Sequence, residues 1–570
     1  MRYHVLACDY DGTIAHHGKV SAPTLDALKR LKDTGRRLML VTGRELDDLA
    51  EHFPALDLFD QVVAENGALL YTPATHAEKP LGEPPPPEFV QALKHRNVTP
   101  LSVGRVIVAT WTPQDQAVFE TIHELGLELQ VIFNKGAVMV LPPGVNKASG
   151  LTAALGELRL SPHNCVGVGD AENDHAFLTL CECSVAVANA LPALKDRADL
   201  VTEADHGRGV TELIERLIRD DLADLGPRLA RHDVQLGKDT QGKELRLRPH
   251  VESVMVAGTS GGGKSTLTTG LLERFIENGY QVCIIDPEGD YEHFEQSVTL
   301  GTSDNPPAVA EALAVLKDPR ESVTLNLLAV GISERPGYLG ELFPELLRLR
   351  ASTGRPHWLV IDEAHHVFPA DWRPTSDLVP EELHGLVLIT VHPDRVAVPV
   401  LQTIDTLIAI GSDPDDTLAS FSDCVGRSPP VRTDARLEAG DGLLWRVASG
   451  SDPTWFRSVP PRRQLRRHLR KYAEGKLGED RSFYFRGPGE RLNLRAANLT
   501  SFVEIGSGLD DETWLFHLRK GDYSRWMSTA IKDEELASEI SEVEQSPDIS
   551  ADESLARIRQ AIDKRYTLPA

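Results

Sequence analysis

Cysteine is scarce in this sequence, and its spacing excludes two classes of protein. Among 570 residues there are six cysteines, namely Cys8, Cys165, Cys181, Cys183, Cys283 and Cys424. They show no paired metal-ligand spacing, and a secreted disulfide scaffold is small and rich in cysteine. Most of them lie in apolar, strand-like runs, so we expect buried free thiols in a reducing cytoplasm.

The sequence also lacks long apolar runs and an excess of positive charge. No uninterrupted apolar run is long enough to cross a bilayer, and the run after Met1 is too short for a signal peptide. Lysine and arginine number 60 against 85 aspartate and glutamate, a formal net charge of −25. This acidity argues against nucleic-acid binding by the whole surface, although a local basic patch remains compatible with it. We expect a cytoplasmic protein with no membrane partner.

What is present is the composition of a globular protein with several domains. Hydrophobic residues make up 41% and charged residues 25%, and at about 150 residues per domain the length predicts three or four units. Strand and helix patterns alternate in two long stretches, which predicts two doubly wound α/β domains with parallel sheets. The expected divisions are 1–219 with a small α+β insertion at about 80–145, a linker at 220–250, a second α/β domain at 251–459, and a basic, mainly helical region at 460–570.

A glycine-rich loop organises the second domain. It runs Gly258-Thr259-Ser260-Gly261-Gly262-Gly263-Lys264-Ser265, between an apolar strand at 254–257 and a helix from Thr266, so amide groups and the helix dipole favour a bound phosphate. Lys264 is expected to reach the β- and γ-phosphates of ATP, and Ser265 to bind Mg²⁺. The alternative is a turn that binds nothing, which the complete motif disfavours. The expected nucleotide contacts are Gly258, Gly261, Gly262, Gly263, Lys264, Ser265 and Thr266.

Acidic residues follow two further strands of this domain. The apolar run 357–361 ends in Asp362 and Glu363, and the run 281–285 ends in Asp286. Hydrolysis of Mg-ATP requires such acids, with Asp362 holding the cation and Glu363 polarising the attacking water. A polar group near His392, after the strand 386–391, could sense the γ-phosphate.

This order of motifs resembles the HerA/FtsK-type ATPases, a RecA-like branch of the P-loop ATPases. The resemblance implies a homo-oligomeric ring, often a hexamer, that pumps DNA. Many relatives carry Glu where Asp290 stands and Gln where His392 stands, so the resemblance supports ATP binding more firmly than a full translocation cycle. An arginine from a neighbouring subunit is expected at each site, and the candidates are Arg348, Arg350, Arg355 and Arg427.

In the first domain, polar residues cluster where strands end. Asp9 and Asp11 follow the first strand, Thr42 the second, and Asp170 and Asp174 a later one, while Lys147 opens a helix. The carboxyl ends of parallel strands meet at one edge of a sheet, so these residues are expected to converge. Two carboxylates one residue apart require a cation between them. Each of these four segments, taken alone, could be an ordinary turn. Their occurrence together in this order favours a functional site.

Together these segments resemble the haloacid dehalogenase superfamily of phosphatases, and Glu65-Asn66-Gly67-Ala68 resembles its Cof-type (IIB) branch. The resemblance implies that Asp9 is the nucleophile and Asp11 the general acid and base. Thr42 and Lys147 would hold the phosphoryl oxygens. Asp9, Asp11 and Asp170 would bind Mg²⁺, with Asp174 in support.

The insertion at 80–145 stands where that branch carries its cap. It is expected to form helices at 87–95 and 113–125 and strands at 105–110, 127–133 and 136–141. It offers no specificity residue by itself. Small phosphorylated metabolites, such as sugar phosphates or phosphoglycolate, are the substrates implied by the resemblance.

The region after residue 459 is basic and then aromatic. Residues 460–476 form an arginine-rich helical pattern, followed by Phe483, Tyr484 and Phe485. Such a stretch could bind DNA, or it could be a charged helix that covers the ATPase. The segment 510–536 is expected to form a small apolar core, and 546–565 a charged helix.

Three functions fit these observations. The first is a Mg²⁺-dependent phosphatase joined to an oligomeric ATPase that acts on or near DNA. The second is a small-metabolite phosphatase regulated by a nucleotide-binding module, and the third is a nucleotide-dependent scaffold. The acids Asp9 and Glu363 count against the third, because binding alone requires neither.

Overall fold

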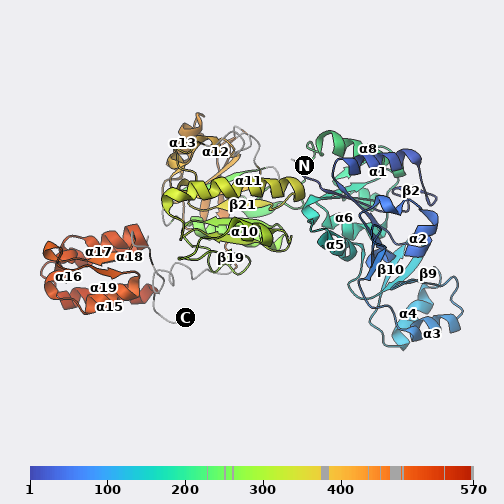
Figure 1. Ribbon diagram of the computed structural model, residues 1–570, viewed down its shortest axis with the longest axis horizontal. Coiled ribbons are helices and arrows are strands. Elements are labelled where there is room, and N and C mark those ends of the chain that lie inside the picture. Colours follow the sequence, from blue (N-terminus) through green and yellow to red (C-terminus); the bar gives the residue numbers. More distant parts are fainter. Residues whose placement is uncertain are drawn as a thin grey trace.

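Figure 1 shows the computed structural model, in which three bodies follow one another in chain order. The structure describes residues 1–226, 229–249, 252–259, 262–373, 384–433, 436–447, 449, 451–462, 477, 481–531 and 533–566. Two of the bodies contain a large, mainly parallel sheet with helices on its faces, and the third is largely helical. The α/β fold class expected from the sequence is confirmed.

The first body is built on a sheet with the order β14-β13-β12-β1-β4-β5-β6-β7. Its central strands are buried on both faces, as expected for apolar runs in a parallel sheet. The strands are β1 (Val5–Cys8), β4 (Arg37–Val41), β5 (Gln61–Ala64), β6 (Leu69–Thr72), β7 (Ala77–Pro80), β12 (Cys165–Gly169), β13 (Cys183–Ala186) and β14 (Leu200–Val201). The helices are α1 (Ala22–Asp33), α2 (Leu46–His52), α5 (Lys147–Glu157), α6 (His175–Leu180), α7 (Pro192–Lys195) and α8 (His206–Asp220). A small hairpin of β2 (Ala15–His16) and β3 (Lys19–Val20) follows β1.

The cap is a separate four-stranded sheet with the order β10-β11-β9-β8. One face packs on its two helices through Phe89, Val118 and Val138, and the other packs toward the first body through Ile107 and Met139. Its strands are β8 (Ser102–Val103), β9 (Val108–Trp111), β10 (Gln130–Asn134) and β11 (Ala137–Leu141), and its helices are α3 (Pro87–His95) and α4 (Asp115–Glu124). The helices and longer strands therefore lie close to their expected positions.

The central body has an eleven-stranded sheet, with the order β16-β15-β25-β24-β23-β17-β22-β21-β18-β20-β19. The strands are β15 (Val234–Lys238), β16 (Glu244–Leu247), β17 (Val254–Gly258), β18 (Val282–Asp286), β19 (Val298–Leu300), β20 (Val323–Asn326), β21 (Trp358–Ile361), β22 (Leu386–Thr390), β23 (Thr406–Ile410), β24 (Asp441–Arg446) and β25 (Thr454–Ser458). The helices are α9 (Lys264–Glu277), α10 (Val309–Leu316), α11 (Arg335–Thr353), α12 (Val398–Leu401) and α13 (Pro414–Val425). A hairpin considered for the 220–250 segment forms from β15 and β16, and β15 pairs with β25, so this segment extends the central sheet.

The first and central bodies meet at the amino-terminal edges of their parallel sheets. The ring of His163, just before β12, stacks on Tyr280, just before β18, with centroids 3.8 Å apart. His163 Nε2 lies 2.7 Å from the Asn278 carbonyl at the end of α9. The Arg355 guanidinium, which is fully buried, donates to the Arg159 carbonyl of the first body at 2.6 Å. A cleft of about 930 Å³ opens beside this contact, lined by residues of both bodies.

The C-terminal body forms around an aromatic core. Phe483, Phe485, Phe502 and Trp514 are buried in it, so two of the three aromatics next to the basic stretch are not exposed for stacking on bases. Its elements are β26 (Phe483–Phe485), β27 (Leu494–Ala496), α15 (Leu499–Ser507), α16 (Asp511–Arg519), α17 (Asp522–Trp526), the π-helix Met527–Ile531, α18 (Glu534–Glu544) and α19 (Ala551–Tyr566). Most of the predicted basic helix, from residue 463 to 476, lies outside the described residues. Among the described helices, none has the length and apolarity needed to cross a membrane.

Candidate active site

Lys147 holds two carboxylates together at the carboxyl edge of the first sheet. Its ammonium donates to Asp9 Oδ1 at 2.5 Å and to Asp174 Oδ1 at 2.6 Å. Asp9 follows β1, Asp174 lies in the 3₁₀ turn Glu172–Asp174 after β12, and Lys147 begins α5 behind the N-cap Asn146. All three are buried, and a buried charge requires such partners. The structure therefore brings together residues that are far apart in the sequence, as the strand-end pattern predicts.

The acidic residues of this edge have the donor set of a hard divalent cation. Oxygens of Asp9, Asp170 and Asp174 lie within 4.8 Å of one another. Asp170 Oδ1 is buried and has no hydrogen-bond partner, which is costly unless a cation binds there. Asp174 uses its Oδ2 to accept the backbone N–H groups of Asp170 and Ala171, at 2.8 and 2.9 Å. Asp174 thus shapes the turn that presents Asp170, and the set fits Mg²⁺.

Burial and like charges shift the titration of these groups. Burial, together with the charge of Asp174, raises the pKa of Asp9 to about 7, and Lys147 offsets part of this shift. Burial lowers the pKa of Lys147, but Asp174 and Asp9 outweigh it and raise the pKa above its usual value. Lys147 is therefore charged at neutral pH. Its single positive charge does not balance the negative charges of the buried carboxylates around it.

Asp11 and Thr42 lie at the same edge and are both bound by Arg44. The Arg44 guanidinium donates to the two carboxylate oxygens of Asp11, at 2.6 and 2.8 Å. Its backbone N–H donates to the Thr42 hydroxyl at 3.1 Å. Arg44 thus positions both residues, a role that the predicted site did not include although Arg44 stands in the same Thr-Gly-Arg segment.

Lys135 enters the site from the cap and was missed from the sequence. It lies in the turn between β10 and β11, and its ammonium donates to Asp170 Oδ2 at 2.8 Å and to the Asp11 carbonyl at 3.1 Å. The residue lies more than a hundred positions from Asp11, and its only sequence signal is the Asn134-Lys135-Gly136 turn between two expected strands.

Glu65 fastens the cap to the first sheet. Its carboxylate, fully buried, accepts the backbone N–H groups of Arg105, Val106 and Ile107 at 2.7, 2.7 and 2.9 Å. Glu65 has φ of 52°, an uncommon conformation for a non-glycine residue. Three charge-assisted hydrogen bonds from the turn between β8 and β9 therefore fix where the cap meets the carboxyl edge of the first sheet.

The glycine-rich loop lies at the carboxyl edge of the central sheet, as predicted. Gly258 ends β17 with φ of 150°, and Gly263 precedes α9 with φ of 95°. The Lys264 ammonium donates to the Gly258 and Thr259 carbonyls, at 3.0 and 2.9 Å. Ser265 and Thr266 occupy the first turn of α9, whereas Gly261 lies outside the described residues.

The acids expected to serve ATP hydrolysis lie at the same edge. Asp362 follows β21 and is buried, and its carboxylate accepts the Glu363 backbone N–H at 2.9 Å. Burial, with the charges of Glu363, Asp290 and Asp286, raises the pKa of Asp362 well above its ordinary value. Such a cluster favours a bound cation.

Two neighbouring groups of the central site are also placed. His365 Nδ1 lies 3.1 Å from the Thr390 hydroxyl at the end of β22, and the His392 backbone N–H donates to the same hydroxyl at 3.0 Å.

Arg350 donates to backbone carbonyls of its own chain, including Pro356 at 2.7 Å, and Arg355 is buried in the contact between bodies. Arg427 likewise donates to a backbone carbonyl of its own chain, that of Val447 at 3.0 Å, and Arg348 lies in an exposed ion pair with Glu345. Which of the four arginines serves a neighbouring subunit therefore stays a prediction.

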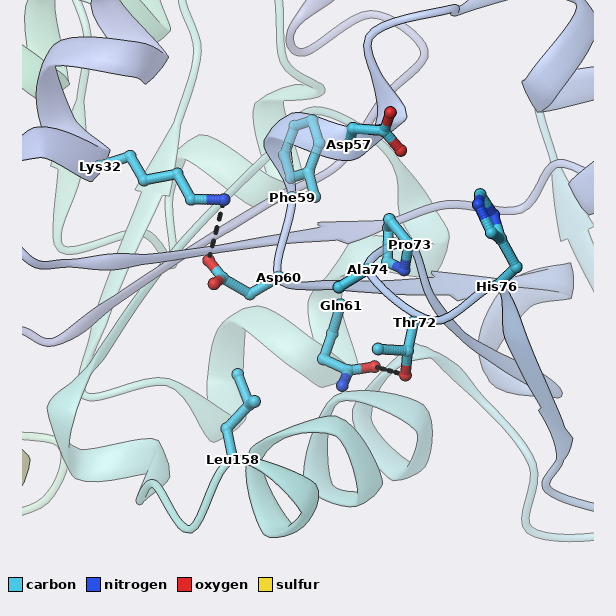
Figure 2. A pocket seen from close by; sticks show the side chains of 10 residues that line it. All are labelled: Lys32, Asp57, Phe59, Asp60, Gln61, Thr72, Pro73, Ala74, His76 and Leu158. Carbon is cyan, nitrogen blue, oxygen red and sulfur yellow. Dashed lines mark hydrogen bonds and ion pairs between the residues drawn. The ribbon is translucent and has the colours of Figure 1, made fainter.

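A separate pocket of about 430 Å³ lies at the opposite edge of the first sheet (Figure 2). It is lined by Lys32, Asp60 and Gln61, among others, and contains a Lys32–Asp60 ion pair at 3.8 Å and a hydrogen bond from the Thr72 hydroxyl to the Gln61 side chain. Gln61 begins β5, whereas Asp9 and Asp170 follow the carboxyl ends of their strands. This pocket therefore belongs to a different part of the surface.

Comparison with known proteins decides the family of the first body. Residues 6–104 and 96–214 match the profile of the haloacid dehalogenase-like hydrolases. A phosphoglycolate phosphatase from Haloarcula marismortui is 30% identical over 217 residues, which are 37% of this chain and 95% of that protein. The chain belongs to the haloacid dehalogenase-like hydrolases. A second relative of this hydrolase, a phosphoglycolate phosphatase from Methanothermobacter thermautotrophicus, is 29% identical over 222 residues, 37% of this chain and 98% of that protein.

Two further comparisons are with a solved structure, which matches the first body, and with a family profile, which matches the central body. A haloacid dehalogenase-like hydrolase from Bacteroides thetaiotaomicron, whose structure is solved, is 18% identical with a TM-score of 0.33, covering 38% of this chain and 99% of its own. Residues 236–342 match the profile of the central domain of helicase HerA. The two family-model matches, to the haloacid dehalogenase-like hydrolases and to the central domain of helicase HerA, confirm both resemblances expected from the sequence.

Proposed function

We propose that the first body is a Mg²⁺-dependent phosphatase that works through an aspartyl phosphate on Asp9. The observation that carries this proposal is Lys147 bridging Asp9 and Asp174 beside the unpartnered Asp170 oxygen. A carboxylate that attacks an anionic phosphate needs this positive charge, because two anions otherwise repel. Asp9, the Asp11 carbonyl and Asp170 would hold Mg²⁺, which supplies further charge neutralisation when bound.

The residues of this edge account for both halves of the reaction. Asp9 attacks phosphorus and displaces the ester oxygen, which takes a proton from Asp11. Asp11 then accepts a proton from the water that hydrolyses the aspartyl phosphate. Lys147 and Thr42 bind the transferring oxygens, and Arg44 positions Asp11 and Thr42. The cap, fastened by Glu65, excludes water from the edge.

For the substrate, we propose small phosphate monoesters, with phosphoglycolate as the first to test. Two relatives that match this body over nearly their whole length are phosphoglycolate phosphatases. The cap reaches the acids directly, because Lys135 in its β10–β11 turn contacts Asp170 and the Asp11 carbonyl, and so close a cap suits a small ester. Sugar phosphates are the second group of substrates in this proposal.

Substitution of Asp9 tests this activity. Asp9→Asn should abolish release of phosphate from phosphoglycolate, a loss of at least about a thousandfold, because the amide cannot act as the nucleophile. Asp26→Asn, in an exposed ion pair on α1, is the matched control and should keep full activity. Equal activity of Asp9→Asn and the control would overturn the proposal.

For the central body we propose ATP hydrolysis, with Lys264 and Ser265 on the phosphates and Mg²⁺, Asp362 on the cation and Glu363 on the water. The support is the loop between β17 and α9, with buried Asp362 at the same sheet edge. Lys264→Ala should abolish ATP turnover while phosphate-ester hydrolysis continues. ATP turnover that survives in Lys264→Ala would contradict this assignment.

The wider proposal is a cytoplasmic homo-oligomeric ring, in the form of a hexamer, that acts on or near DNA. It is supported by the match to the HerA central domain and by the free cysteines, five of which are buried. ATP turnover at low salt with and without duplex DNA tests it, because phosphate-backbone binding weakens as salt rises. Stimulation by DNA that Lys264→Ala lacks is the expected result. Indifference to DNA would favour the alternative, in which the nucleotide module regulates a metabolite phosphatase.

A further inference from the structure

We propose that Lys135 selects substrates with a second anionic group, and that it does so by leaving the metal position when the metal binds. This inference rests on the proposed phosphatase function and assigns one residue of that site. It concerns a cap residue that the established family membership does not define.

Lys135 lies where the metal is expected. Its ammonium contacts Asp170 Oδ2 and the Asp11 carbonyl, at 2.8 and 3.1 Å, and both residues belong to the expected Mg²⁺ ligands. A single positive charge therefore neutralises the acids that a divalent cation would neutralise. An ammonium in contact with these oxygens and a Mg²⁺ bound at about 2.1 Å from the same carboxylate and carbonyl would lie within a few ångströms of each other, and the two cations would repel. The metal therefore displaces the ammonium.

The lysine is built to move without its backbone. Lys135 has φ of 48° in the tight turn of the β10–β11 hairpin, and the paired strands fix the position of its Cα. Its side chain is 45% exposed, unlike that of Lys147 at 1%. Four flexible bonds let the ammonium reach a new partner while it remains above the catalytic edge.

The other cations around Asp9 are already committed to carboxylates. Lys147 is bound by Asp9 and Asp174, and Arg44 by Asp11 and Asp48. Metal binding leaves Lys147 its Asp174 partner and leaves Arg44 both of its carboxylates, whereas it displaces Lys135 from both of its contacts. Of these three cations, Lys135 is thus the one that becomes available to a substrate.

The displaced ammonium defines a substrate class. It remains within a side chain's length of the acids, so its partner must be an anion close to the phosphate. A phosphate monoester of a short hydroxy acid places a carboxylate there, and a charge-assisted hydrogen bond would hold it. A neutral alcohol phosphate offers no such partner.

Two esters of equal length test the selection. We would compare kcat/KM for 2-phosphoglycolate and 2-hydroxyethyl phosphate in wild type, Lys135→Met and the control Lys94→Met, an exposed lysine on cap helix α3. Lys135→Met should lose roughly 10- to 100-fold on phosphoglycolate and less than about threefold on the neutral ester. Lys94→Met should match wild type on both.

Metal binding gives a second readout that needs no substrate. Titration calorimetry of Mg²⁺ should show tighter binding to Lys135→Met than to wild type, because the competing ammonium is gone. Equal losses on both esters, or unchanged Mg²⁺ affinity, would overturn the role of Lys135 alone. Wild type that hydrolyses neither ester would overturn the proposed function itself.

Discussion

At the scale of single residues, a glycine lies against Asp170, one of the acids proposed to bind the metal. Gly12 lies in the turn after Asp11 with φ of 91°, and a Cβ there would lie 2.3 Å from Asp170 Oδ2. An alanine would therefore push away the carboxylate whose other oxygen is unpartnered. The turn needs glycine for its backbone conformation and for its contact with Asp170.

Gly35 provides a matched control for this position. It has φ of 90° with nothing within 4 Å of a Cβ, so Gly35→Ala carries the backbone strain alone, about 1 kcal/mol of unfolding free energy. Gly12→Ala should show that loss and also bind Mg²⁺ at least about tenfold more weakly, since one ligand is displaced. Thermal melts and Mg²⁺ titrations of both variants check this. Equal Mg²⁺ affinity in the two variants would contradict it.

The raised pKa of Asp9 predicts a pH dependence of metal binding. Without metal the pKa of this carboxyl is about 7, so below that pH a proton competes with Mg²⁺ for the carboxylate. Affinity should fall about tenfold per pH unit below 7 and level off above it. Titrations in buffers of different ionisation enthalpy should show about one proton released at pH 6. Affinity that is constant from pH 5 to 8 would contradict this.

At the scale of elements, strand ends were predictable and contacts between elements were not. Asp9, Thr42 and Asp170 follow apolar runs, and parallel pairing brings such ends to one edge whatever the loops do. Lys135 and Glu65 act between the cap and the sheet, and their partners are set by how two separate sheets pack. No periodicity in the sequence encodes that packing.

The Glu65 contact predicts how the cap is held. Glu65→Gln keeps the shape of the side chain but loses its charge, and its amide group offers one acceptor oxygen for three N–H groups. Amide exchange should therefore speed up at residues 105–107, by about tenfold or more, without global unfolding. Hydrogen exchange read by mass spectrometry measures this, with Glu88→Gln on α3, an exposed residue, as control. Unchanged exchange at 105–107 would show that the cap is held by its apolar contacts.

At the scale of the whole molecule, buried polar groups join the first and central bodies. Arg355 donates to the Arg159 carbonyl of one body and to the Gln281 side chain and Leu316 carbonyl of the other. Arg355→Met removes this donor from the Arg159 carbonyl and from the Gln281 side-chain oxygen, at about 1–3 kcal/mol each, whereas the Leu316 carbonyl keeps the Gln281 amide at 3.1 Å. We expect calorimetry to show the two bodies unfolding at more widely separated temperatures, with phosphatase activity retained at 25 °C. Arg348→Met, in an exposed pair on α11, should melt as wild type does, and an identical profile for Arg355→Met would refute the expectation.

Because the first and central bodies contact each other through the amino-terminal edges of their sheets, the two carboxyl edges lie at opposite ends of the pair. Both catalytic edges point away from the shared seam, and two strands of four or five residues at about 3.3 Å per residue put the two reactions on the order of 30 Å apart. Phosphate released at the carboxyl edge of one sheet enters bulk solvent before it can reach the carboxyl edge of the other sheet. Each reaction thus depends on the bulk concentration of its own substrate. Coupling between the two sites would therefore act through conformational change across the contact between the bodies, and not through a product passed from one site to the other.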